Sequence, residues 1–258
     1  MSHRNKPRTP RERHAGHCVP GERAVRELLA AAPRRVELVR VDRRRDWSAL
    51  LAEAASAGVP VEHVDSEVLR RDLDGADPRG VVAYARPPSF EPLDAVLARA
   101  NDVAAPPRQL LVALDEVADP QNLGAIMRSC EFFGVQGLLW TRDRAAQVTP
   151  TVVRASAGAS ERLPLVQVTN LATALGECKD AGWWVLGTVA DEGTPLRELV
   201  AQNVLPDRLV VVMGSEGRGI RRLTRETCDF LATIERRGQV GSLNVSVAAA
   251  VTLSWLVG

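Results

Sequence analysis

The run of apolar residues at 210–213 is the feature of this 258-residue chain that most restricts its fold. Three consecutive valines followed by a methionine predict a strand buried on both faces, and such strands belong to parallel sheets covered by helices. The glycines Gly214, Gly217 and Gly219 come next, and they let the backbone turn sharply and approach a ligand closely. Since open α/β sheets bind ligands beyond the carboxyl ends of their strands, this loop predicts one wall of a ligand site.

An alternation of apolar strands with amphipathic helices runs through the chain from residue 108 to its end. Alternation of this kind predicts an α/β domain, whose mainly parallel sheet is covered by helices on both faces. The predicted strands lie at residues 110–114, 137–140, 163–168, 183–189, 209–213 and 230–234, and the predicted helices between them at 122–133, 171–181 and 223–228.

The residues before 108 predict a separate, smaller unit. Residues 18–86 have the pattern of a compact α/β domain, and the stretch 87–107, bounded by prolines, is predicted to be a linker that includes a short helix at 93–100. The predicted helices of the smaller domain lie at 21–32, 47–57 and 66–73, and its predicted strands at 35–41, 59–64 and 80–85.

Basic charge is concentrated at the amino terminus. The first fourteen residues carry five basic side chains against one acid, so residues 1–17 are predicted to be a disordered basic tail. The net charge of the whole chain is only +1, which by itself neither favours nor excludes a nucleic-acid partner. The apolar runs are too short to span a bilayer and no signal peptide is recognised, so a cytoplasmic protein is expected.

Several catalytic chemistries are excluded from the larger domain by residues that it lacks. All four histidines, His3, His14, His17 and His63, precede residue 87. A Ser-His-Asp or Cys-His nucleophile system, or an H-E-x-x-H metal site, therefore cannot form within this domain. There is no P-loop, and the glycine loop at 214–219 has the order G-x-x-G-x-G instead of the Rossmann order G-x-G-x-x-G.

The cysteines indicate neither a disulfide framework nor a metal site. Cys18, Cys130, Cys178 and Cys228 are isolated, without any C-x-x-C pair, and two of them fall on the apolar faces of predicted helices. Buried free thiols are expected, and no metal ligands are assigned.

A second polar segment precedes the helix at 122–133. Asn122 is a candidate N-cap, Gly134 a candidate helix stop, and Arg128 lies off the apolar face of the helix. Two interpretations stay open at this stage. Asn122 and Arg128 are either a simple cap and a solvated charge, or parts of a site shared with the glycine loop.

The final helix, at 243–257, is apolar around almost its whole circumference. A helix of this kind must be buried on most sides, so it either completes the core or packs against a second subunit. Asn244 and Ser246 at its start are consistent with helix capping and equally with ligand contacts.

These three segments, in this order, closely resemble the three motifs of the SpoU/TrmH family of RNA ribose 2′-O-methyltransferases. The resemblance covers roughly residues 108–258, and the sequence between the motifs is similar to the subgroup that methylates a guanosine of bacterial large-subunit ribosomal RNA. The matching residues are Asp115-x-x-x-Asp119-Pro120-x-Asn122-x-Gly124-x-x-x-Arg128, then Met213-Gly214-Ser215-Glu216-Gly217-x-Gly219, then Ser242-Leu243-Asn244-Val245-Ser246-Val247-Ala248.

The resemblance implies an enzyme with a SPOUT-type parallel sheet, whose carboxyl-terminal part is threaded into a deep trefoil knot. The residues before 87 resemble, more loosely, the small α/β RNA-binding domain that such enzymes carry in front. The resemblance also implies S-adenosylmethionine as cofactor, RNA and not DNA as partner, and a homodimer formed through the C-terminal helix.

Site residues follow from the same resemblance. It implies a catalytic shell of Asn122, Arg128, Glu216, Ser242 and Asn244, and a cofactor pocket formed by Met213, Gly214, Gly217, Ile234, Leu243 and Asn244. A guanidinium has no acceptor atom, so Arg128 is expected to orient a phosphate and stabilise a developing alkoxide. The proton of the ribose hydroxyl then passes to a carboxylate, a water or an RNA phosphate.

The chain departs from the family pattern at three places. Charged residues at 235–237 follow Ile234 where the family has proline and small or apolar residues, Gly241 replaces a usual serine, and residues 77–80 stand where a His-Gln-Gly turn is common. Alternative functions therefore stay open. They are 2′-O-methylation of transfer RNA, methylation of a resistance-type ribosomal target, and a catalytically idle RNA-binding or ribosome-assembly factor.

Overall fold

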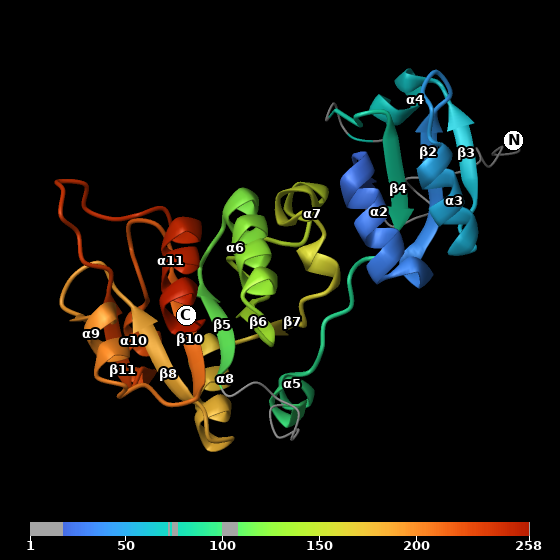
Figure 1. Cartoon of the computed structure of the whole chain (residues 1–258). Coiled ribbons are helices and arrows are strands. Elements are labelled where there is room, and N and C mark those ends of the chain that lie inside the picture. The colour runs from blue at the N-terminus through green and yellow to red at the C-terminus, as the bar shows by residue number, and fades with distance from the viewer. Residues whose placement is uncertain (1–17, 72, 74–76, 100–107, 258) are drawn as a thin grey trace, which may run out of the picture. The chain divides into compact units, whose positions relative to one another are not determined.

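The computed structural model describes residues 18–71, 73, 77–99 and 108–257. The predicted basic tail, residues 1–17, and residues 100–107 of the predicted linker lie outside the described residues. By its contacts the chain divides into two compact units (Figure 1). One unit comprises Met1–Pro88 with Val148–Arg162, and the other Ser89–Gln147 with Leu163–Gly258.

The described residues of the smaller unit form a four-stranded sheet in the order β1-β4-β2-β3. The central strands β2 and β4 pair antiparallel, whereas β2 and β3 pair parallel. Its elements are β1 (Cys18–Pro20), α2 (Glu22–Ala31), the 3₁₀ turn η1 (Pro33–Arg35), β2 (Val36–Asp42), α3 (Ser48–Ser56), β3 (Val61–Val64), α4 (Ser66–Arg71) and β4 (Val81–Ala85).

The predicted elements of this unit are confirmed to within a few residues at each end. Helix α2 buries Val25, Leu28 and Leu29, which recur at helical spacing and form one face against the sheet. Strand β1 was not predicted, because three residues are too short to display a periodic pattern.

The insertion at Val148–Arg162 also belongs to the smaller unit and was not predicted from the sequence. It contains α7 (Pro150–Ser156) and the 3₁₀ turn η2 (Ala159–Glu161). Val153 of α7 is fully buried in the core of this unit. A segment that leaves one domain to pack in another gives no local signal, because its periodicity looks the same in either environment.

In the described part of the larger unit, seven strands form one sheet in the order β7-β6-β5-β10-β8-β11-β9. Every pairing between these strands is parallel, which confirms the predicted sheet. The strands are β5 (Gln109–Asp115), β6 (Gly137–Thr141), β7 (Leu165–Val168), β8 (Trp184–Thr188), β9 (Thr194–Pro195), β10 (Arg208–Gly214) and β11 (Phe230–Thr233).

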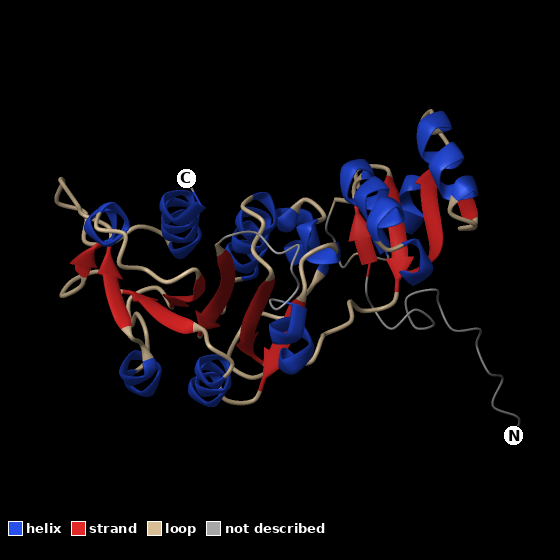
Figure 2. Ribbon diagram, turned by 60° about the horizontal axis from the view of Figure 1, so that its bottom comes forward, coloured by secondary structure: helices blue, strands red, loops and turns tan. Residues whose placement is uncertain are grey.

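Helices cover both faces of this sheet, as predicted (Figure 2). On one face, α5 and α8 bury Val96, Leu171 and Leu175 against strand residues such as Val212. On the other, α11 packs against α6, α9 and β10. The helices are α5 (Leu93–Arg99), α6 (Pro120–Phe132), α8 (Leu171–Asp180), α9 (Leu196–Ala201), α10 (Arg222–Thr227) and α11 (Val245–Val257).

Strand β10, the valine-rich run, lies near the middle of the sheet between β5 and β8. Its residues 209–213 are buried, as expected for a strand covered on both faces. Strand order alone does not define how the final loops thread through one another, so the trefoil knot stays a prediction.

Two further features bear on the sequence predictions. Among the described residues, no helix combines the length and the apolar character that a membrane span requires.

Cys18, Cys130, Cys178 and Cys228 are free thiols, the first three buried and the fourth half-buried. Burial raises the pKa of Cys178 and of Cys228 to about 12, so both thiols are protonated at neutral pH.

Candidate active site

Helix α6 begins at Pro120, after a loop of residues 116–119 that follows the carboxyl end of β5. The N-cap is Asp119, whose Oδ1 accepts a hydrogen bond from the Gln121 amide at 2.8 Å. The prediction that Asn122 caps this helix is therefore wrong. Asn122 lies in the first turn and is only 7 % exposed. Because Asp119 is the cap, the side-chain amide of Asn122 can form hydrogen bonds with residues outside the helix. The predicted stop is confirmed, because Gly134 follows the last turn with φ of 70°.

The glycine loop after β10 folds back on itself. The amide of Ser215 donates to the Gly219 carbonyl at 3.1 Å, and the amide of Gly219 donates to the Ser215 carbonyl at 2.9 Å. A Cβ on Gly214 would lie 2.2 Å from the carbonyl carbon of Gly219, so only glycine allows this approach. Gly217 and Gly219 have φ of 82° and 65°, the left-handed region that favours glycine.

The third segment leads into helix α11, which begins at Val245, two residues later than predicted. Oδ1 of Asn244 accepts hydrogen bonds from the Ser246 amide at 2.9 Å and from the Ser246 hydroxyl at 2.6 Å. These bonds define the orientation of the amide, because the oxygen must face Ser246 and the nitrogen must face the other way. Asn244 therefore caps the helix and also presents an NH₂ group to its neighbours.

The three segments meet in one hydrogen-bonded cluster, which we call the amide–carboxylate cluster: Asn122, Glu216 and Asn244. Oε1 of Glu216 accepts from Nδ2 of Asn122 and from Nδ2 of Asn244, each at 2.8 Å. Nδ2 of Asn244 also donates to Oδ1 of Asn122 at 3.0 Å. One carboxylate oxygen of Glu216 is thus held by two amides, and the other makes no hydrogen bond to any described residue.

The other two predicted catalytic residues lie outside this cluster. Arg128 is exposed on α6, and its side chain makes no hydrogen bond or ion pair among the residues that the structure describes. Ser242 is exposed and lines the cavity described next. Arg128 is therefore available to a substrate.

A cavity of about 450 Å³ opens at the carboxyl ends of β8, β10 and β11. Its walls are the loop after each of these strands together with the start of α11, so it stands where ligands bind in α/β sheets. Of the predicted pocket residues it includes five, and Asn244 does not line it. Those five are Met213, Gly214, Gly217, Ile234 and Leu243.

The sequence predictions missed one wall of this cavity, formed by Thr188, Val189 and Ala190 after β8. The Thr188 hydroxyl donates to the Val212 carbonyl at 2.9 Å and so links β8 to β10. A signal was available, because residues 183–189 were predicted to be a buried parallel strand and its carboxyl end had to reach the same edge of the sheet.

The charged residues at 235–237 line the rim of the cavity. Glu235 pairs with Arg197 of α9 at 2.6 Å, and Arg236 lies 3.7 Å from Asp191 in the loop after β8. Both pairs are solvent-exposed, so each contributes little to stability. Their effect is geometric, since they connect the loop after β11 to two neighbouring elements.

A partly buried ion pair connects the first motif with the loop before α10. Asp115 is fully buried, and Arg221 donates to it twice, from the backbone amide at 2.8 Å and from Nε at 2.6 Å. Because Asp115 ends β5 and Arg221 follows the glycine loop, the pair holds two walls of the site in register. Asp115 belongs to the first motif, and its partner lies 106 positions away in the sequence.

Arg221→Gln is expected to lower the free energy of unfolding by about 2 kcal/mol, because it leaves a buried carboxylate with the backbone donor alone. The neighbouring Arg222 pairs with Glu226 on the surface, and Arg222→Gln is the matched control, expected to change stability by less than about 0.5 kcal/mol. Urea unfolding of the two variants would measure the difference. Equal stabilities would remove the structural role given to the Asp115 pair.

The fold and the site together define a class of protein: a parallel α/β protein with three polar segments joined beside a ligand-sized cavity at the strand ends. The chain belongs to the SpoU rRNA Methylase family, whose sequence model matches residues 109–254. A second model, described as RNA 2′-O ribose methyltransferase substrate binding, matches residues 18–91.

Individual relatives agree with this assignment. The 23S rRNA (guanosine-2′-O-)-methyltransferase RlmB of Photobacterium profundum is 39 % identical over 90 % of this chain and 94 % of that protein. RlmB of Pseudomonas aeruginosa is 40 % identical over 90 % of this chain and 92 % of that protein. Among solved structures, the SpoU methyltransferase AviRb of Streptomyces viridochromogenes, in complex with AdoMet, is 26 % identical with a TM-score of 0.75, covering 98 % of this chain and 93 % of AviRb.

Proposed function

We propose that this protein transfers a methyl group from S-adenosylmethionine to the ribose 2′-hydroxyl of a guanosine in 23S ribosomal RNA. The amide–carboxylate cluster carries the proposal, because it joins the three family motifs beside the cavity at the strand ends. The substrate is taken from the relatives, which are named for methylation of a 23S rRNA guanosine and align over 90 % of this chain.

The cavity suits S-adenosylmethionine in size and in lining. Its volume of about 450 Å³ falls within the range of about 300–1,000 Å³ that ligand pockets occupy. Apolar side chains, among them Met213, Ile234 and Leu243, line one part of it and match an adenosine, while charged groups at the rim match an amino-acid end. When bound, the cofactor supplies an electrophilic methyl group on a sulfonium.

The chain's own residues then perform two tasks. The walls of the cavity hold the donor, and an RNA-binding surface sets the 2′-oxygen in line behind the methyl group, so that positioning supplies a large share of the rate. As the oxygen–carbon bond forms and the carbon–sulfur bond breaks, the hydroxyl proton must leave. The second oxygen of Glu216 is the acceptor we assign, since its first oxygen is held by two amides.

Arg128 is proposed to bind a phosphate next to the target ribose and to stabilise the developing alkoxide. Arg128→Ala is expected to lower the single-turnover rate about 100-fold, the loss typical of removing one charge-stabilising donor. Arg128→Lys keeps the charge without the bidentate geometry and is expected to lose about tenfold. A Lys variant with the wild-type rate would show that bidentate geometry is not required, and an Ala variant with that rate would exclude the role.

We further propose that the protein acts as a homodimer through α11, in the cytoplasm where ribosomal RNA is found. Helix α11 buries Ala249 and Leu253 within its own unit but leaves Val247 and Trp255 about half exposed. Exposed apolar side chains on one helix are consistent with a subunit interface. Sedimentation equilibrium would measure the mass, and a monomer at all concentrations would contradict the dimer.

The function is tested with the purified protein, labelled S-adenosylmethionine and unmodified 23S rRNA and transfer RNA transcripts. We expect one 2′-O-methylguanosine in the 23S transcript and none in transfer RNA. Modification of transfer RNA alone would replace the proposed substrate and keep the chemistry. Cofactor binding without transfer to either RNA, or no cofactor binding, would favour a ribosome-assembly role.

A further inference from the structure

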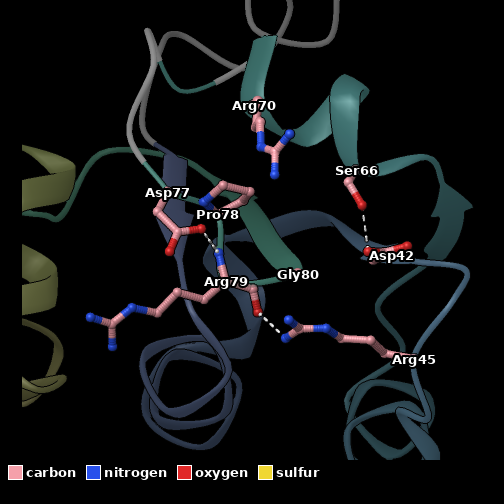
Figure 3. Close-up of a pocket in the computed structure, with 8 residues that line it drawn as sticks. All are labelled: Asp42, Arg45, Ser66, Arg70, Asp77, Pro78, Arg79 and Gly80. Atoms are coloured by element: carbon pink, nitrogen blue, oxygen red, sulfur yellow. Dashed lines mark hydrogen bonds between the residues drawn. The ribbon is translucent and has the colours of Figure 1, made fainter.

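A second cavity, of about 260 Å³, lies in the smaller unit at the end of β2 (Figure 3). We call it the arginine pocket. Three segments form it: the turn after β2, helix α4, and the turn that leads into β4. The lining residues are Asp42, Arg45, Ser66, Arg70, Asp77, Pro78, Arg79 and Gly80.

The two carboxylates of the arginine pocket are already engaged by local donors. Asp42, which is buried, accepts from the Ser66 hydroxyl at 2.5 Å and from the Arg44 amide at 3.0 Å. Two hydrogen bonds lower the pKa of Asp42: that from the Ser66 hydroxyl has the larger effect, and that from the Arg44 amide the smaller. Asp77 accepts from the Arg79 amide at 2.9 Å. Both carboxylates therefore stabilise the segments that form the pocket.

The turn before β4 has a left-handed backbone conformation and packs closely against its neighbours. Arg79 and Gly80 have φ of 49° and 86°, and Nη1 of Arg45 donates to the Arg79 carbonyl at 3.1 Å. A Cβ on Gly80 would lie 2.9 Å from the Trp47 ring and 3.1 Å from Arg45. The turn at Arg79 and Gly80 is thus packed closely against Trp47 and Arg45, and Arg45 is anchored on its backbone.

Arg70 differs from the other charged groups that line the pocket. It extends from the last turn of α4 toward the turn at Pro78, whereas the Arg79 side chain points to the other side (Figure 3). Its guanidinium makes no hydrogen bond or ion pair with any described residue. A guanidinium has five donors and no acceptor, and Arg70 is exposed, so it is available to a partner that carries several acceptor oxygens.

We propose that the arginine pocket binds a backbone phosphate of the substrate RNA, with Arg70 as its principal ligand and the free donors of Arg45 as the second. Phosphate oxygens accept paired N–H groups in the geometry that arginine presents. This proposal rests on the proposed function only for the identity of the RNA. It assigns to the smaller unit a defined contact that positions RNA without reading its sequence.

The test compares Arg70→Ala with Arg71→Ala in the full-length protein. Arg71 is the adjacent, exposed residue of the same helix and does not line the pocket, so it controls for loss of one positive charge. Affinity for an unmodified 23S rRNA transcript is measured over a range of salt concentrations. For Arg70→Ala we expect binding about tenfold weaker at low salt. The slope of log K against log salt is negative, and we expect it to become less steep by about 0.7, as for one lost phosphate contact.

Two results would overturn the pocket: a wild-type slope for Arg70→Ala, or the same loss of slope for Arg71→Ala. Cofactor binding, measured by calorimetry, must stay at the wild-type level in both variants. This control shows that a loss of RNA affinity does not come from misfolding. If wild-type protein methylates transfer RNA instead, the same slopes are measured on that RNA, so the proposed substrate and the pocket fail independently. Inorganic phosphate and guanosine monophosphate are added as competitors, and competition by either one at low concentration would assign the pocket to a free anion instead.

Discussion

Gly214→Ala is expected to weaken S-adenosylmethionine binding by up to about 100-fold, because overpacking a rigid site by one methyl group costs up to about 3 kcal/mol. The new Cβ would lie 2.2 Å from the Gly219 carbonyl carbon and 2.4 Å from the Ile220 nitrogen. Both are backbone atoms, so no side chain can swing aside. Relief requires that the loop 214–219 opens, and that loop is one wall of the cavity. Titration calorimetry with S-adenosylmethionine measures the loss directly.

Gly241→Ala is the matched control for this experiment. Gly241 lines the same cavity, yet its Cβ would meet nothing nearer than Arg236 at 4.0 Å, and its φ lies outside the left-handed region. Near wild-type affinity is expected. If both variants bound the cofactor equally well, the cavity would not be the cofactor site, whichever RNA the enzyme modifies.

Glu216→Gln is expected to slow methyl transfer about 1,000-fold while cofactor affinity stays close to that of the wild type. Gln is nearly isosteric, and its carbonyl oxygen can still accept from Asn122 and Asn244, so the cluster keeps its geometry. What is lost is the carboxylate oxygen assigned as the proton acceptor, and general-base contributions amount to about 10²–10⁴-fold. Single-turnover kinetics with saturating cofactor isolate the chemical step.

Glu235→Gln serves as the control, because Glu235 lines the same cavity but pairs with Arg197, outside the amide–carboxylate cluster. It is expected to turn over at nearly the wild-type rate. A Glu216→Gln enzyme with full activity would exclude the carboxylate as acceptor, leaving a water or an RNA phosphate for that role.

The limits of sequence reasoning are clearest at Asn122. Asparagine before an apolar helical run predicts an N-cap, but the sequence Asp119-Pro120 two residues earlier is the stronger start signal, with an acidic cap followed by proline at the first helical position. Once Asp119 caps the helix, the Asn122 amide lies inside the first turn and can reach Glu216. The alternative interpretation of Asn122, as part of a shared site, agrees with this geometry.

Other parts of the site had no local signal. The Asp115–Arg221 pair joins residues 106 positions apart, and the wall at 188–190 becomes part of the cavity only because β8 lies beside β10 and β11. The departure at 235–237 was visible in the sequence, but its ion-pair partners were not. Its partners, Arg197 and Asp191, are brought near by the packing of α9 and the loop after β8.

The sequence by itself determined the parallel α/β sheet, the position of most strands and helices, and the identity of the three polar segments, because these depend on periodicity and on residues within a few positions of one another. Tertiary structure alone decided that Asn122, Glu216 and Asn244 share hydrogen bonds, that Val148–Arg162 joins the smaller unit, and that Arg70 faces a cavity. Contacts of this kind depend on the order of strands in a sheet and on the packing of distant segments. Local propensity carries no information about either.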